Sequence, residues 1–197
     1  MSKTAVRAAD SRTISEYITH VWQIKPIFEE SEMSGDENIL KISHLSTTQS
    51  HLEQVVKING LAWNQDLDAD EIQSRVQALK ELVEGSSPQE GCLLIAVRDG
   101  EIVGFARATH RTGEGSPWMF SHLVVHPQHQ RSGVATELCK ACIDHASAYR
   151  ATTFLSETHL DNVGSVAFHS AFRFKNEGEY ESSDGDKKVQ YSYSLSS

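Results

Sequence analysis

The 197-residue sequence lacks any apolar run close to the roughly 18 residues that a membrane-spanning helix needs. Its first residues contain no apolar signal core, so we expect a cytoplasmic protein with no membrane partner. Basic residues are scarce, because 18 Lys and Arg stand against 27 Asp and Glu, a formal net charge of −9. This balance argues against nucleic acid as a partner. It permits a cationic substrate, because a negative cleft concentrates amines.

Cysteine is also scarce, and the odd count of three argues against a disulfide framework. Cys139 and Cys142 form a C-x-x-C pair, a spacing also found in redox and metal sites. The pair falls on a predicted helix, without a second pair of Cys or His at metal-ligand spacing. We therefore expect two small apolar core residues and no metal cofactor. The same lack of ligand spacing applies to His110, His126, His129, His145 and His159.

Residues 1–37 are expected to form an N-terminal extension with a disordered start, one helix over 11–25 and an acidic linker over 29–37. Residues 38–197 are expected to form one domain, since that length buries a substantial core. Apolar periodicity predicts its strands at 39–42, 93–97, 102–106, 118–125, 152–156, 174–180 and 189–195. It predicts its helices at 48–61, 68–84, 134–149 and 162–172.

The resulting order is β-α-α-β-β-β-α-β-α-β-β. Hairpins precede a βαβ unit, as with the Asp99-Gly100 turn between two apolar runs. The predicted class is therefore α/β with a mixed sheet.

The most informative segment is the loop between the strand ending at Val125 and the helix opening at Gly133. Such a loop directs main-chain N–H groups at one point, where the helix dipole also favours negative charge, and this geometry binds phosphate. Gly133 permits close approach of the backbone, and Ala135 is small enough to leave the ligand room. The loop lacks the Gly-Lys-Ser/Thr of a Walker loop and the additional glycines of a dinucleotide fingerprint.

Its spacing, Gln130-x-x-Gly133-x-Ala135, resembles the acetyl-CoA loop of the GCN5-related N-acetyltransferase (GNAT) superfamily. The element order is similar too. A second superfamily pattern matches from Asn162 to Phe174, with His169 in place of the usual Tyr and Arg173 in place of the usual Gly. We expect the turn at Arg173 to differ locally from that of the family. Three segments, 61–63, 131–136 and 160–163, look like those of bacterial aminoglycoside 6'-N-acetyltransferases.

The resemblance implies acetyl-CoA as acetyl donor and assigns its contacts to main-chain groups. The pantetheine arm and the developing oxyanion are expected at Leu123, Val124 and Val125. The pyrophosphate is expected at main-chain amides of Arg131, Ser132, Gly133, Val134, Ala135 and Thr136, and Gln130 is expected to contact the cofactor from the same loop. The Arg131 side chain either reaches a phosphate or is solvated. Asn162 either touches the cofactor or only caps its helix, and Phe168 is a further candidate contact.

The resemblance also implies catalytic roles. His169 stands where the family places its general acid, and the alternative is a histidine that packs in the helix. Glu157, at the end of a predicted strand, is the candidate to bind or deprotonate the acceptor ammonium, and the alternative is a solvated glutamate. His122 is a second candidate base. Ser121 and Arg107 stand where the aminoglycoside enzymes carry acidic residues.

Three functions stay open at this stage. The first is acetyl transfer to a primary amine of a small cationic substrate, an aminoglycoside being one candidate, by direct attack in a ternary complex. The second is transfer to a protein or peptide amine, and the third is a non-catalytic acyl-CoA-binding module. A homodimer is the commonest assembly for such a chain, and the sequence does not decide it.

Overall fold

The computed structural model describes residues 39–110 and 117–195, so the expected extension of residues 1–37 lies outside the described residues. Their element order matches the expected one. The strands are β1 (Lys41–His44), β2 (Gly91–Arg98), β3 (Glu101–His110), β4 (Trp118–Val125), β5 (Thr153–His159), β6 (Lys175–Glu181) and β7 (Lys187–Ser194). The helices are α1 (Gln49–Ala62), α2 (Ala69–Glu84), α3 (Val134–Ala148) and α4 (Val163–Ala171), with a short 3-10 helix, η2 (Pro127–His129).

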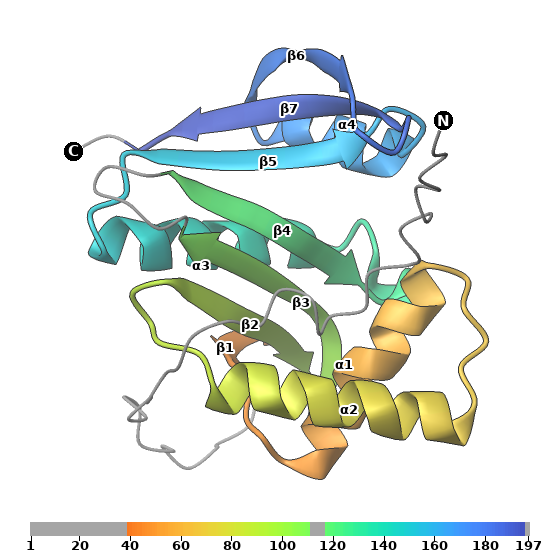
Figure 1. The fold of residues 1–197 in the computed structure, drawn as a ribbon. Coiled ribbons are helices and arrows are strands. Elements are labelled where there is room, and N and C mark those ends of the chain that lie inside the picture. The colour runs from red at the N-terminus through yellow and green to blue at the C-terminus, as the bar shows by residue number, and fades with distance from the viewer. Residues whose placement is uncertain (1–38, 111–116, 196–197) are drawn as a thin grey trace, which may run out of the picture.

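The strands form one seven-stranded sheet in the order β1-β2-β3-β4-β5-β7-β6 (Figure 1). All neighbours are antiparallel except β4 and β5, which run parallel because α3 crosses between them. The predicted turn at Asp99 and Gly100 joins β2 to β3 with positive φ angles of 53° and 81°, as a tight hairpin requires. The expected mixed sheet is confirmed.

Helices cover both faces of the sheet, α1 and α2 on one face and α3 and α4 on the other (Figure 1). The predicted apolar face of α1 is buried over the first face. On the second face the predicted stripe of α3 is buried from Val134 through Leu138 and Cys142 to Ala146, while Tyr149 stays partly exposed. Each face therefore has its own core, and the sheet separates them.

The start of α2 is fixed by its sequence. The Asp68 carboxylate accepts from the Glu71 N–H at 2.8 Å, and the Glu71 carboxylate accepts from the Asp68 N–H at 3.1 Å. This confirms the predicted capping box. Gly85 ends the helix as expected, with an ordinary right-handed φ of −77°.

One strand boundary differs in a way that matters for the site. β5 was predicted to end at Ser156, with Glu157 at its end, but it continues to His159. The extra residues pair with β7, for example Glu157 with Gln190 and Thr158 with Val189. Glu157 therefore lies within a strand, and its side chain points to the sheet face opposite to those of Ser156 and Thr158.

The expectation for Arg173 is wrong. Arg173 adopts a left-handed φ of 65° directly after α4, the conformation that a glycine would take there. The Phe174 N–H then donates to the His169 carbonyl at 2.9 Å, and the Arg173 N–H donates to the Ser170 carbonyl at 3.1 Å. These are the bonds of a glycine-type helix end, so the turn keeps its shape and the arginine bears the strain.

All three cysteines are buried and free, and burial raises the pKa of the Cys139 thiol to about 12. The burial of Cys139 and Cys142 agrees with their predicted role as core residues. In the described parts of the chain, no helix combines the length and apolarity that crossing a bilayer requires.

Candidate active site

The sheet opens between β4 and β5. Their parallel pairing comprises three residue pairs and ends at Phe120 and Ser156. Beyond this point, residues 123–125 pair with β3 on one side only, so main-chain groups on the other side face the gap. This is the opened strand edge that the sequence predicted for a pantetheine arm.

A β-bulge marks the place where the strands separate. Arg107 pairs with His122 and Ala108 with Phe120, which leaves Ser121 as the extra residue on β4. The bulge changes which side chains face α3. Phe120 before it and Leu123 after it both pack in the α3 core, whereas Val124 packs against α1 and α2. His122 therefore points away from the side chain of Leu123, and its Nδ1 lies 3.3 Å from the Ser121 hydroxyl oxygen.

The loop after β4 forms a concave main-chain surface at the start of α3. Arg131 and Gly133 both have positive φ angles, 62° and 87°. Gly133 is the residue that precedes α3, and no side chain caps this helix end. The Ser132 hydroxyl donates to the His129 carbonyl at 2.6 Å, which ties the loop to η2. The N–H groups of the first turn of α3 are therefore left for an anionic ligand.

Gly133 also leaves room for that ligand. A Cβ placed on it meets no atom within 4 Å. The positive φ and the open space together make a cradle that a larger residue would strain and fill. The residues present thus fit the diphosphate of coenzyme A.

The predicted cofactor contacts differ in what their side chains do. Val134 and Val124 are 1% and 7% exposed and belong to the cores, so only their main-chain groups are available to a ligand. The Gln130 side chain donates to the Val125 carbonyl at 3.4 Å. Ala135 and Thr136 line the cavity beside the loop.

Helix α4 borders the other side of the gap. Asn162 precedes the helix, and its Oδ1 accepts from the Ser165 N–H at 3.1 Å, so the capping role left open by the sequence is present. Asn162 and Phe168 also line the cavity. The Phe168 ring packs at 5.6 Å on that of Phe172.

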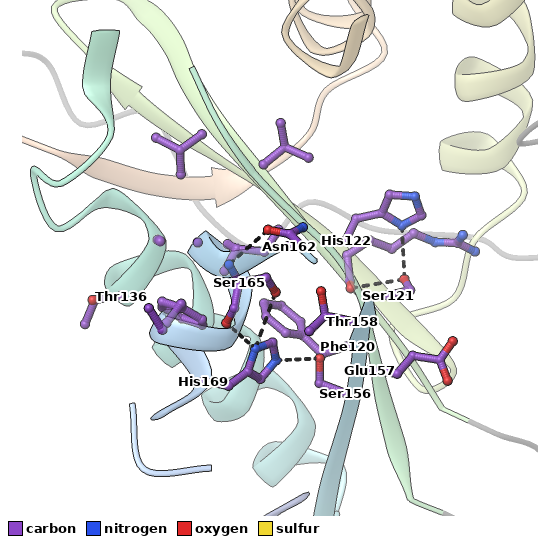
Figure 2. A pocket seen from close by; sticks show the side chains of 18 of the residues that line it. Phe120, Ser121, His122, Thr136, Ser156, Glu157, Thr158, Asn162, Ser165 and His169 are labelled. Atoms are coloured by element: carbon purple, nitrogen blue, oxygen red, sulfur yellow. Dashed lines mark hydrogen bonds between the residues drawn. The ribbon is translucent and has the colours of Figure 1, made fainter. Parts of the chain in front are cut away.

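His169 lies at the centre of a buried hydrogen-bond network (Figure 2). Its Nδ1 is 2.7 Å from the Ser165 carbonyl oxygen, and its Nε2 is 2.8 Å from the Ser156 hydroxyl. The ring stacks on Tyr191 at 4.3 Å and meets the edge of Phe174 at 5.0 Å. His169 is 3% exposed. Burial lowers its pKa below the usual value, although the bond to Ser165 opposes this, so the ring is neutral at pH 7.

A cavity of about 970 Å³ passes along the gap, with lining residues from both faces of the sheet. Ser156 and His169 line it from the α4 side. His122 and Glu157 line it from the opposite side, and Figure 2 shows both pointing away from His169. The opening between β4 and β5 thus connects the side of the sheet next to α3 and α4 (the α3–α4 side) with the side next to α1 and α2 (the α1–α2 side).

The α1–α2 side of the cavity carries mixed charge. The Glu157 carboxylate accepts from the Tyr180 hydroxyl at 2.6 Å and lies 3.7 Å from the Lys188 ammonium. Its side chain is 42% exposed, so one edge stays open to a ligand. Trp63, at the end of α1, lines the same cavity and is 58% exposed. The structure thus brings Glu157 and His122 into one cavity but does not bring either into contact with His169.

Burial and, second, the positive charge of Arg107 lower the pKa of His122 to about 4. The ring is therefore neutral at pH 7, as a base must be. A base this weak is a poor match for proton transfer at neutral pH, because the best catalytic pKa lies near the working pH.

The sequence reasoning missed Ser156. The signal was present, because Ser156 and Thr158 alternate with Glu157 and share the face of the apolar Phe154, which is buried in the α3 core. A buried polar residue on that face needs a partner, and α4 supplies His169. Among the described residues, no group of three or more His, Cys, Asp or Glu is placed to hold a metal ion.

Comparison with known proteins decides the family. Residues 53–174 match the model of the Acetyltransferase (GNAT) family. The chain belongs to the GNAT acetyltransferase family. It is 29% identical over 134 residues to the aminoglycoside N(6')-acetyltransferase type 1 of Acinetobacter haemolyticus. The aligned segment covers 65% of this chain and 87% of that relative. It is therefore an acetyl-CoA-dependent acetyltransferase.

Solved GNAT structures share the fold. A protein of the GNAT family from Desulfovibrio desulfuricans superposes with a TM-score of 0.64 at 15% identity, over 79% of this chain and 99% of that one. An aminoglycoside 6'-N-acetyltransferase complexed with coenzyme A superposes with a TM-score of 0.61 at 15% identity, over 78% of this chain and 96% of that one.

Proposed function

We propose that this GNAT enzyme transfers acetyl to a primary amine of a small cationic substrate, by direct attack within a ternary complex. The observation that carries the proposal is that one continuous cavity is lined from both faces of the sheet, because it lets donor and acceptor meet at the β4–β5 gap without a covalent enzyme intermediate. The Acinetobacter haemolyticus relative, an aminoglycoside acetyltransferase, supports a small amine as acceptor.

Acetyl-CoA supplies an activated thioester, and the reaction replaces its C–S bond by a C–N bond while one proton passes from nitrogen to sulfur. The protein has to hold both partners and handle that proton. The first-turn N–H groups of α3 and the loop at Gly133 would hold the diphosphate. The open main-chain edge at 123–125 would hold the pantetheine arm and offer N–H donors to the thioester oxygen.

The acceptor amine would bind on the α1–α2 side of the cavity, where Glu157 is the proposed anchor for the substrate ammonium. Its partly exposed carboxylate attracts a cation, and the hydrogen bond from Tyr180 and the ion pair with Lys188 fix its orientation. Lys188 and Arg107 place two positive charges at the same cavity, whose wall lacks the acidic residues of the aminoglycoside enzymes at Ser121 and Arg107. We therefore expect compact amines with one or two charges to be used better than polycations.

The test is release of free coenzyme A across a panel of amines: aminoglycosides, small mono- and diamines, and peptides with a free N-terminus or lysine. We expect the highest kcat/KM with a small amine. Glu157→Gln should raise the KM for that amine about tenfold, the size of a lost ionic hydrogen bond. Glu181→Gln on β6, an exposed glutamate outside the cavity, is the matched control. Turnover of peptides alone would replace the small-amine assignment with a protein acceptor.

A further inference from the structure

The hydrogen bonds of His169 fix where its proton sits. Nδ1 is 2.7 Å from the Ser165 carbonyl oxygen, which can only accept, so Nδ1 carries the hydrogen. In the neutral ring Nε2 then holds a lone pair. The contact of 2.8 Å between Nε2 and the Ser156 hydroxyl is therefore donated by Ser156. In this state His169 has no proton at Nε2 to give.

Ser156 occupies the position from which a proton can reach the reacting atoms. It is the last β5 residue paired with β4, so it stands where the gap begins. It lines the cavity and is 3% exposed, which keeps bulk water away from its hydroxyl. With its hydrogen directed at His169, the oxygen still has lone pairs that can accept.

We propose that Ser156 is the catalytic proton carrier of the reaction and that His169 acts through it as a positioning and proton-holding residue. As the amine attacks, its proton moves to Ser156 Oγ while the Ser156 proton moves to His169 Nε2. As the C–S bond breaks, Nε2 returns the proton to Oγ and the hydroxyl proton passes to sulfur. One proton thus leaves nitrogen and one arrives at sulfur, and both residues end as they began.

The proposal rests on the proposed transfer to an amine, and it reverses the order of events expected for His169. A general acid must start protonated, whereas this ring starts neutral. It becomes an acid only after it has received the proton of the amine. The groups packed on the ring favour this order, since Tyr191 and Phe174 are uncharged neighbours at pH 7. Burial and, second, the carboxylate of Glu179 raise the pKa of the Tyr191 hydroxyl, so Tyr191 stays uncharged at pH 7.

The first test uses the full-length protein without ligand. Nitrogen-15 NMR of the histidine rings should show neutral His169 with hydrogen on Nδ1 and an unprotonated Nε2. Ser156→Ala should shift the Nε2 resonance, because its donor is lost. Ser192→Ala on β7, a serine outside the cavity, should leave it in place. A neutral ring with hydrogen on Nε2 would overturn the proposal.

The second test measures turnover with the best amine of the panel. Ser156→Ala should lower kcat about 100-fold, as loss of a general acid–base group does, and leave the KM for acetyl-CoA within about twofold. His169→Asn retains a donor for Ser165 but loses Nε2. The double variant should be no slower than either single one, because the two residues act as a unit. A kcat of Ser156→Ala within about threefold of the wild-type value would show a purely structural serine.

If the wild-type protein acetylates no amine, the proposed function fails, and the role of Ser156 is tested separately. Coenzyme A bound to the protein is titrated by the ultraviolet absorbance of its thiolate. A hydroxyl that donates to sulfur lowers the pKa of the bound thiol, so Ser156→Ala should raise that pKa by about one unit. Equal thiol pKa values in the two proteins would overturn the proposal.

Discussion

Arg107 and His122 lie opposite each other in the β3–β4 register, beside the bulge at Ser121. Burial and the guanidinium charge lower the pKa of His122 to about 4, whereas the unfolded chain has a histidine pKa near 6.5. As the pH falls below 6.5, His122 becomes protonated in the unfolded state, whereas in the folded state it becomes protonated only near pH 4. The neutral ring therefore favours the folded state above pH 6.5, and this contribution is lost as the pH falls to 4.

We expect His122→Gln to remove this part of the pH dependence. Between pH 7 and pH 4 the wild-type protein should lose up to about 3 kcal/mol more unfolding free energy than the variant. Denaturant unfolding at a series of pH values measures the difference, in which the carboxylates shared by both proteins cancel. Parallel stability curves for the two proteins would show that His122 titrates normally.

Gly133→Val should abolish measurable binding of coenzyme A, because the side chain would enter the open space at the start of α3. Gly185→Val is a matched control, since Gly185 also has a positive φ (89°) and open space but lies in the β6–β7 turn. Both variants bear similar backbone strain, so both should lose stability. Isothermal calorimetry should show retained affinity in the control alone. Retained affinity in Gly133→Val would contradict the diphosphate site.

Arg173→Gly should stabilise the protein by about 1 kcal/mol, because glycine takes the left-handed φ of 65° without the Cβ clash. Arg173→Ala keeps the clash and removes the charge, so it separates strain from electrostatics and should give no gain. The midpoint of chemical unfolding measures both variants. Equal gains in the glycine and alanine variants would assign the effect to the arginine side chain.

The three cysteines should not react with a thiol reagent in the native protein at pH 8. All are buried, and the pKa values of Cys139 and Cys142 are raised, chiefly by burial for the first and by the hydrogen bond with Cys92 for the second. Three thiols should appear on unfolding in guanidinium chloride. Rapid labelling of the folded chain would reopen a redox role for the C-x-x-C pair.

The parts of the fold that were predictable from sequence are those set by local chemistry. Asp68 and Glu71 fix a helix start by themselves, and Asp99-Gly100 fixes a hairpin. The loop around Gly133 is similar, because one glycine after a strand and before a helix already determines where the N–H groups point.

The missed features depend on contacts between distant segments. The length of β5 is set by pairing with β7, some thirty residues later in the chain, so the position of Glu157 within a strand was not visible locally. The partnership of Ser156 and His169 requires that strand and α4 to be placed together first. At Arg173, the packing of Phe174 into the core holds a turn that local propensity disfavours.

The extra residue in β4, Ser121, makes the end of this strand sensitive to deletions. Because Ser121 is an extra residue in β4, the side chain of Leu123 faces the core under α3 and the side chain of Val124 faces the core under α1 and α2. Deletion of a single residue at this point would reverse the faces of the residues at the end of β4. Side chains that now pack under α3 would then point to α1 and α2, and the reverse. Replacement of Ser121 by another residue leaves that phasing intact, so the length of this strand is more tightly constrained than the identity of the residue within it.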